Sequence, residues 1–325
     1  MSFVFVNRFS YIHRFFNGLR DKKHLFLWSL VSSGILSSLT VISFASSAFA
    51  GDPFRTVNPR NISEETELAF KALFEEGNYV EAKEYLALPK KSSFNDPMSA
   101  ALRASLAYTE QDWNNLDIYA QKTLDYAKAI RNDDPLRSNL YLAVGNFLMG
   151  ASEYQSKGAI AAITRLQAVF NYFDQAERID STDPELNLIK GYLNLFLAVN
   201  LPFSSPQQAI ANLQTYASPQ YLVNRGIALA YRDLGDYDLA LTFVNKALES
   251  TPLNPELYYL KGQILRNKGQ TDNNILVLEE AVKNFDIAIA KIDQLPLEAV
   301  QKPLQREKRK TLETINQLKM VSQGN

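Results

Sequence analysis

The side chains most often used for catalysis are scarce in this chain of 325 residues. It has no cysteine, which excludes disulfides, thiolate metal sites and cysteine nucleophiles. Its two histidines, His13 and His24, both lie within the first 24 residues. Acid–base chemistry in the rest of the chain would therefore depend on carboxylates, lysine or tyrosine.

Neighbouring acidic residues are the remaining candidates for chemistry. A glycosidase-like pair of acids could meet in the folded chain. The sequence lacks the GxSxG, GxxxxGK[ST] and GxGxxG patterns and the EF-hand spacing. We therefore predict no catalytic residue, no metal site and no cofactor, and a carboxylate enzyme is the least favoured function. Helix capping and solvation explain the acidic pairs, which are Glu64-Glu65, Glu75-Glu76, Asp133-Asp134 and Glu279-Glu280.

Residues 1–50 have the composition of a secretory signal peptide. A basic stretch is followed by the largely apolar residues 25–44, and the small-x-small sequence Ala48-Phe49-Ala50 follows. This order predicts cleavage after Ala50. The alternative is an uncleaved anchor that contacts the membrane through residues 25–45, since about 20 apolar residues can span a bilayer. Both interpretations place the rest of the chain outside the cytoplasm.

Removing residues 1–50 would change the net charge of the chain. The whole sequence has 34 basic and 35 acidic residues, a balance of −1. The leader holds 5 of the basic and 1 of the acidic residues, which leaves 29 and 34 and a balance of −5. This mild acidity argues against a nucleic-acid partner, because phosphate binding needs a basic surface.

From Asn61 onward, apolar residues recur every three or four positions, which is the spacing of helices with one buried face. No segment alternates with the period of a strand, so no sheet is predicted. Residues 51–60 hold two prolines without periodicity and are expected to form a linker. Helix starts are marked by prolines that follow a capping residue: Asp96-Pro97, Asp134-Pro135, Asp183-Pro184, Ser205-Pro206, Ser218-Pro219 and Asn254-Pro255.

A spacing of 34 residues recurs along the chain. It separates Gly235 from Gly269 and Ala228 from Gly262. The clearest unit runs from Tyr221 to Asn254 and has small or apolar residues at regular offsets, namely Ala228, Tyr231, Gly235, Tyr237, Ala240, Val244, Ala247 and Pro252. In length and pattern this unit resembles the tetratricopeptide repeat, a pair of antiparallel helices joined by a turn.

The resemblance implies an all-α, TPR-like solenoid of about five to seven helical hairpins over residues 61–290. It is strongest over residues 221–290, and elsewhere the loops depart from the repeat pattern. Residues 291–325, with the basic run 305–310, are expected to form a C-terminal helix that caps the array.

The resemblance also implies a concave groove, lined by the first helix of each pair, that binds a segment of a protein or peptide partner. Arginines can hold a carboxylate by paired hydrogen bonds, so the predicted ligand is an acidic segment or the C-terminal carboxylate of a partner. The alternative is that the arginines pair with acids of the chain itself, such as Asp233. The predicted groove residues are Leu188, Tyr192, Phe196, Arg225, Arg232, Tyr259, Arg266 and Asn267.

Residues 186–203 are hydrophobic on more than one face. Burial between neighbouring hairpins explains this pattern most simply. A groove for a lipid or an apolar peptide is the alternative.

These features predict an exported, non-enzymatic scaffold for protein–protein interaction in the cell envelope. The chain looks like the exported, functionally unassigned tetratricopeptide-repeat proteins of bacteria, including cyanobacteria. The alternative is a transport-associated protein that binds a lipid or another apolar solute. We expect the periplasm as its compartment, with the thylakoid lumen, or a membrane-anchored position outside the cytoplasm, as alternatives.

Overall fold

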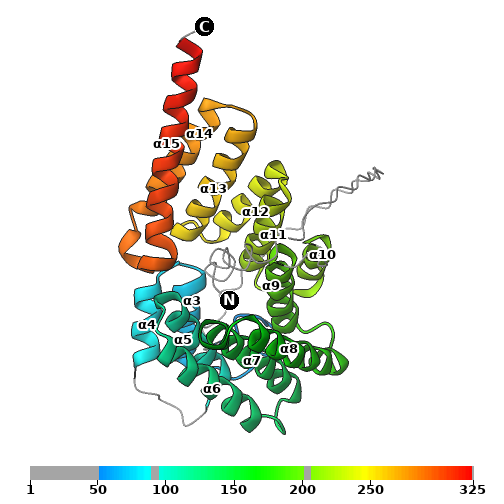
Figure 1. The fold of residues 1–325 in the computed structure, drawn as a ribbon. Coiled ribbons are helices and arrows are strands. Elements are labelled where there is room, and N and C mark those ends of the chain that lie inside the picture. The colour runs from blue at the N-terminus through cyan, green and yellow to red at the C-terminus, as the bar shows by residue number, and fades with distance from the viewer. Residues whose placement is uncertain (1–50, 89–94, 201–205, 324–325) are drawn as a thin grey trace, which may run out of the picture.

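The computed structural model describes residues 51–88, 95–200 and 206–323. In these ranges the chain forms thirteen α-helices, of which the first twelve pack as consecutive antiparallel pairs (Figure 1). This confirms the predicted all-α array of TPR-like hairpins. The pairs are α3 (Glu64–Phe74) with α4 (Tyr79–Ala87), α5 (Pro97–Glu110) with α6 (Trp113–Ala129), α7 (Pro135–Lys157) with α8 (Ala159–Ile179), α9 (Pro184–Asn200) with α10 (Pro206–Tyr216), α11 (Gln220–Leu234) with α12 (Tyr237–Ser250), and α13 (Pro255–Thr271) with α14 (Ile275–Ile289).

The chain then continues into a single terminal helix, α15 (Lys302–Gln323). Two short helical turns precede it, η2 (Ile292–Gln294) and η3 (Leu297–Gln301). α15 packs mainly along α14 and also contacts α13. Figure 1 shows it at the end of the array that α13 and α14 form.

Capping side chains begin the helices at most of the expected prolines. Asp96, Asp134 and Asn254 accept hydrogen bonds from backbone amides in the first turns of α5, α7 and α13. Asp183 likewise accepts from the amide of Leu186 at 2.8 Å. Pro219 itself precedes α11 as its capping residue, so α11 has no side-chain cap, and Ser205 lies outside the described residues. These bonds satisfy amides that have no partner within the helix.

Within a pair, the two helices approach closely where the first helix carries a glycine. A Cβ added to Gly262 of α13 would lie 2.5 Å from two ring carbons of Phe285 on α14. A Cβ added to Gly191 of α9 would lie 2.5 Å from the side chain of Leu213 on α10. The missing side chains therefore make room for the large apolar residue of the second helix.

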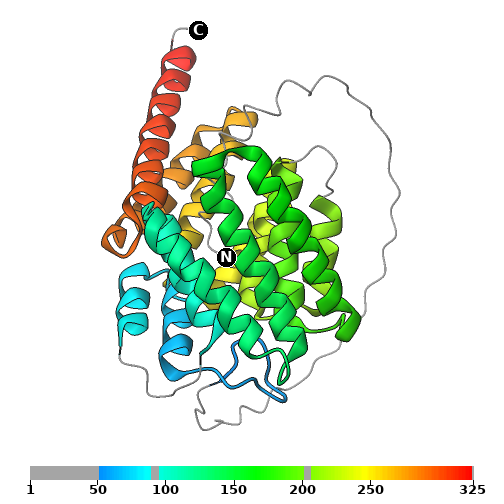
Figure 2. The ribbon, with the colours of Figure 1, turned by 60° about the horizontal axis from the view of Figure 1, so that its bottom comes forward.

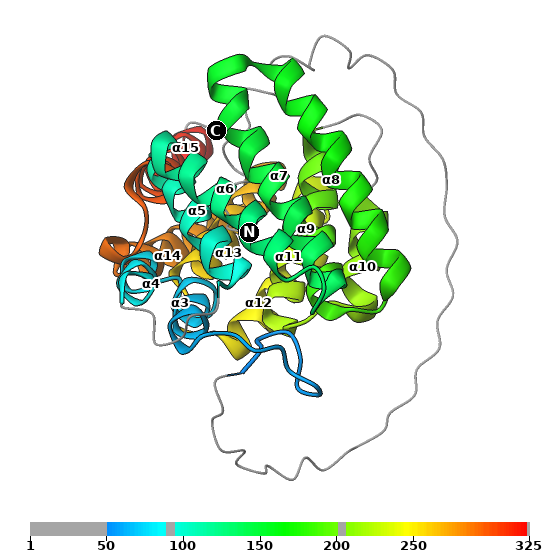
Figure 3. The same cartoon turned by 90° about the horizontal axis from the view of Figure 1, so that it is seen from below.

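The array closes on itself, because its first hairpin packs against its sixth. The side-chain amide of Asn254 donates to the carbonyl oxygen of Phe74 at 3.0 Å, and the hydroxyl of Tyr79 donates to Glu256 at 2.7 Å. α4 also contacts η2, and α5 contacts η3. Figures 1 and 3 show the pairs following one another around a common centre, with α3 and α4 beside the α13 end.

Residues 51–60, expected to form a linker, contain no helix or strand and pack onto the body (blue in Figure 2). Phe54 is buried, with its ring centroid 5.3 Å from that of Phe70. Arg60 reaches the first turns of α7 and α9, where its guanidinium bonds Asp134, Asp183 and Glu185 at 2.8 to 2.9 Å. The segment is therefore anchored by buried contacts at the N-terminal ends of two inner helices.

The predicted leader, residues 1–50, lies outside the described residues, and so do both histidines and Leu201 to Phe203. Among the helices that the structure describes, none combines the length and the apolar character needed to cross a bilayer.

A substitution at Gly262 tests how closely the paired helices α13 and α14 pack. We expect Gly262→Ala to lower the free energy of unfolding by about 1–3 kcal/mol, because the new methyl group overlaps the ring of Phe285. Denaturant unfolding of the two chains measures the difference.

A second variant checks the cause. In Phe285→Leu the ring is gone, so adding Gly262→Ala to that background should cost less than it does in the native chain. An equal cost in both backgrounds would show that the ring contact is not responsible.

Candidate partner-binding site

Most of the positions expected to line an open groove are buried. Consecutive first helices are in contact, as in α5 with α7, α9 with α11 and α11 with α13. The side chains at the predicted apolar positions, Leu188, Tyr192 and Phe196, are buried. Since these positions are filled from within the molecule, they do not present an open surface in this conformation.

The apolar stretch of α9 is part of the core. The ring of Phe196 packs edge-on against Phe147 at 5.6 Å, and the hydroxyl of Tyr192 donates to the carbonyl oxygen of Leu222 at 2.7 Å. Leu188 borders a cavity of about 60 Å³ at the centre, beside Phe54 and Met98. A cavity that admits benzene is about 150 Å³, so this one is too small for a lipid chain. The described part of 186–203 therefore packs as core.

Arg225 is buried with an acid of the chain itself. Its guanidinium nitrogen lies 2.7 Å from Oε2 of Glu256, and Tyr79 donates to Oε1 of the same carboxylate. Burial lowers the pKa of Arg225 and the Glu256 carboxylate raises it, and the net shift is upward. Arg225 therefore stays charged, and its partner in this structure is Glu256.

The other two arginines lie near the C-terminal helix. Arg232 binds Asp233 at 2.7 Å and Gln263 at 2.9 Å. Glu307 of α15 lies 3.5 Å from Arg266 and accepts a hydrogen bond from Tyr259 at 3.0 Å.

The chain thus supplies the acids that a partner was expected to bring to these residues. Asn267 follows Arg266 on α13 and is half-buried. A role of the predicted groove residues in partner binding stays a prediction. For Tyr259 and Arg266 it would require Glu307 to move away from them.

A second buried glutamate repeats the arrangement around Glu256. Glu185 in the first turn of α9 accepts from the hydroxyl of Tyr141 at 2.6 Å and from Arg60 at 2.8 Å. Arg137 approaches it to 3.5 Å. Burial raises the pKa of Glu185 above its usual range, while the two arginines act to lower it. Both buried acids are therefore held by basic partners and joined to tyrosine, in positions closed to a substrate.

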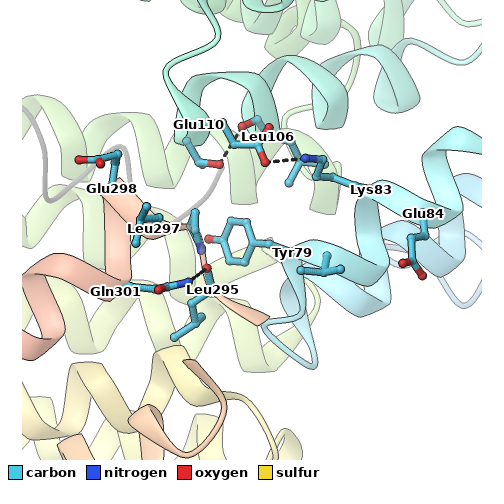
Figure 4. A pocket seen from close by; sticks show the side chains of 12 residues that line it. Tyr79, Lys83, Glu84, Leu106, Glu110, Leu295, Leu297, Glu298 and Gln301 are labelled. Atoms are coloured by element: carbon cyan, nitrogen blue, oxygen red, sulfur yellow. Dashed lines mark hydrogen bonds and ion pairs between the residues drawn. The ribbon is translucent and has the colours of Figure 1, made fainter. Parts of the chain in front are cut away.

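An open cleft lies elsewhere, on the flank of the first two hairpins. It has a volume of about 540 Å³ and separates α4 and α5 from the segment 295–301 (Figure 4). Its apolar lining includes Val80 of α4 and Leu297, residues that are 49% and 55% exposed. Exposed aliphatic side chains on both walls are typical of a surface that receives an apolar group.

Charged residues surround this cleft. Glu84, Glu110 and Glu298 line it together with Lys83. Lys83 pairs with Glu110 at 2.6 Å and Lys302 pairs with Glu298, so the excess negative charge of the cleft comes from Glu84. In Figure 4 these side chains lie around Tyr79 and Leu297. The cleft therefore combines an apolar lining with an acidic margin.

The depression continues along the side of α4, α5 and α6. A second one, of about 310 Å³, shares Lys83, Leu106 and Glu110 with the cleft. A third, of about 230 Å³, shares Arg103 and Tyr119 with the second.

The third depression is basic. Arg103 and Lys122 both lie over the ring of Tyr119, at 5.6 and 5.1 Å from its centroid. We call the three together the lateral groove; it is acidic at the Leu297 end and basic at the Tyr119 end.

Sequence reasoning missed the lateral groove. Its acidic end joins residues near position 80 to residues near position 297, and no spacing along the chain signals that contact. The residue types give little help either, because Val80 and Leu297 look like ordinary apolar positions in the sequence.

Among the described residues, no group of His, Cys, Asp or Glu side chains is arranged to hold a metal ion.

Comparison with known families identifies the repeats at the C-terminal end of the array. Residues 226–252 and 255–284 match the model of the tetratricopeptide repeat. These stretches cover most of the pairs α11–α12 and α13–α14. Repeats of this family are typical of non-catalytic scaffolds that bind other proteins. No curated protein sequence is significantly similar to the chain.

The different burial of two arginines gives a test of their roles. Arg225→Met should lower the free energy of unfolding by about 3–5 kcal/mol, because it leaves the buried Glu256 without its counter-charge. Arg266→Met should cost less, because the one ion pair of Arg266 is 3.5 Å long, Glu307 keeps its bonds from Tyr259 and Gln263, and methionine still fills the space of the arginine stem. Denaturant unfolding of both variants measures this contrast, and equal losses would contradict it.

Proposed function

We propose that the chain is an exported scaffold that binds a protein partner in the cell envelope. The observation that carries the proposal is the lateral groove, an open surface on an array whose inner face is filled. Repeats of the matched family bind proteins, and this groove offers a continuous place for an extended segment. Export rests on the signal-peptide pattern of residues 1–50.

The groove favours a particular kind of partner segment. An apolar side chain of the segment would lie between Val80 and Leu297, where burial contributes about 1.5–3 kcal/mol. A basic residue near that side chain would face Glu84. At the other end, acidic residues would face Arg103 and Lys122. Charge complementarity of this kind sets the direction in which a segment lies.

A crosslinking experiment identifies the partner. A photo-reactive amino acid replaces Leu297 in the full chain, expressed in its native host. A second chain carries it at Leu276 of α14, which is 76% exposed and lies outside the groove. We expect a distinct protein to crosslink at position 297 and not at 276, and to fractionate with the envelope.

The captured protein is then purified and titrated against the chain. Leu297→Asp should weaken binding by about 30-fold, a loss of about 2 kcal/mol that is typical of a central contact. Leu276→Asp should leave the affinity unchanged. Equal affinities of both variants would reject the groove as the site, and recovery of the chain in the cytoplasmic fraction would reject export.

A further inference from the structure

The backbone nitrogen of Gly51 lies next to a carboxylate of the first helix. It is 2.7 Å from Oε2 of Glu67 on α3. The other oxygen of Glu67 pairs with Lys71 at 2.6 Å, and the Glu67 side chain is 12% exposed. The two oxygens of one largely buried carboxylate thus receive a side-chain ammonium and the nitrogen of Gly51.

Neighbouring contacts fix Gly51 in this position. The carboxylate of Asp52 is buried and accepts from the backbone amides of Phe54 at 2.9 Å and Arg60 at 3.1 Å. Phe54 packs against Phe70 of the same helix that carries Glu67. The turn between residues 52 and 60 therefore holds the start of the segment against α3.

Gly51 also follows the predicted cleavage site, Ala48-Phe49-Ala50. A peptide amide offers Glu67 one hydrogen and no charge. The amine of a new N-terminus would offer three hydrogens and a positive charge. The bond to the ionised Glu67 is charge-assisted in both cases, and the ammonium adds the attraction between two opposite charges.

We propose that the bond between Ala50 and Gly51 is cleaved and that Glu67 binds the new α-ammonium of Gly51. An endopeptidase of the signal-peptidase class adds one water across the bond. Ala50 leaves as a carboxylate and Gly51 keeps its nitrogen as an amine, which holds a proton below its pKa. The inference rests on the export part of the proposed function and deepens it.

Charges around Gly51 determine the sign of the effect. Glu67 and Asp52 favour the ammonium form, and Lys71 and the more distant Arg55 and Arg60 oppose it. Arg55 and Arg60 are each paired with Asp183. Lys71 is 46% exposed, so water screens its repulsion. The net effect raises the pKa of the α-amino group above its ordinary value of about 7.7–8.0.

A raised pKa links the contact to stability. The folded chain then holds the proton more tightly than the unfolded chain does. The stabilisation is complete below the ordinary pKa and is lost as pH rises through the raised one. The contact should therefore contribute at pH 7 and disappear in alkaline solution.

The first experiment determines the N-terminus. The full chain is expressed with export, and the purified product is analysed by intact mass and N-terminal sequencing. We expect a chain that begins at Gly51. An exported chain cut at another bond would overturn this inference and leave the proposed function standing. A full-length chain kept in the cytoplasm would reject export itself.

The second experiment measures the α-amino pKa of the exported chain. Reductive methylation with ¹³C-formaldehyde labels that amine together with the lysines, and the NMR shift of the α-dimethylamino signal is followed against pH. In the native chain we expect a pKa about one unit above the ordinary value, a tenfold difference in proton affinity.

Three variants assign the shift. Glu67→Gln should remove it, and Lys71→Gln should increase it. Glu76→Gln, which deletes an exposed acid just beyond the end of α3, should leave it in place. The difference in Tm between the native chain and Glu67→Gln should also shrink as pH rises through the α-amino pKa, leaving the part due to the Lys71 pair. An α-amino pKa that Glu67→Gln does not lower would overturn the inference, even in a chain that begins at Gly51.

Discussion

The closed shape of the array depends on one buried carboxylate, that of Glu256 at the start of α13. It joins the first hairpin through Tyr79 and the fifth through Arg225, while α13 itself belongs to the sixth. A buried acid is costly unless its charge is compensated and its oxygens are hydrogen-bonded. Arg225 of the neighbouring hairpin compensates the charge, whereas Oε1 of Glu256 receives the hydroxyl of Tyr79 only when the two ends of the array are together. The cost of leaving this buried oxygen without a donor therefore opposes opening of the ring.

Closure determines which surfaces remain for recognition. A solenoid that stays open keeps its first helices exposed on a concave face. Here the corresponding helices meet around a centre with a cavity of about 60 Å³, and their side chains form the core. Near the C-terminal end, α15 places Glu307 against Tyr259 and Arg266. The inner face thus contributes stability, and the flank along α4, α5 and α6 carries the open depressions of the lateral groove. The same contacts that fill the centre also create the cleft, since closure brings Leu297 opposite Val80.

Local features of the fold could be predicted from the sequence, because they depend on residues close together in the chain. The caps Asp96, Asp134 and Asn254 and the turn at Gly235, with its positive φ of 81°, follow from the geometry of helix ends. The pairing of Arg232 with Asp233, left open as an alternative, also joins neighbours in the sequence. Closure could not be predicted in this way. Tyr79 and Glu256 are 177 residues apart, and their contact depends on the small rotation between successive hairpins, which side-chain packing sets.

The segment that precedes the first helix has a structural role that composition concealed. Two prolines and a lack of periodicity indicate a linker. Yet Arg55 and Arg60 of this segment pair with acids at the starts of α7 and α9. Asp134 and Asp183 cap α7 and α9, and Glu185 lies one residue into α9, so three carboxylates meet where two inner helices begin. Each is favourable for its own helix dipole, and together they repel one another. Arg60 binds all three and so removes the conflict that capping creates. A chain that needs acidic caps on adjacent inner helices therefore also needs a basic segment across them, and here that segment directly follows the predicted leader.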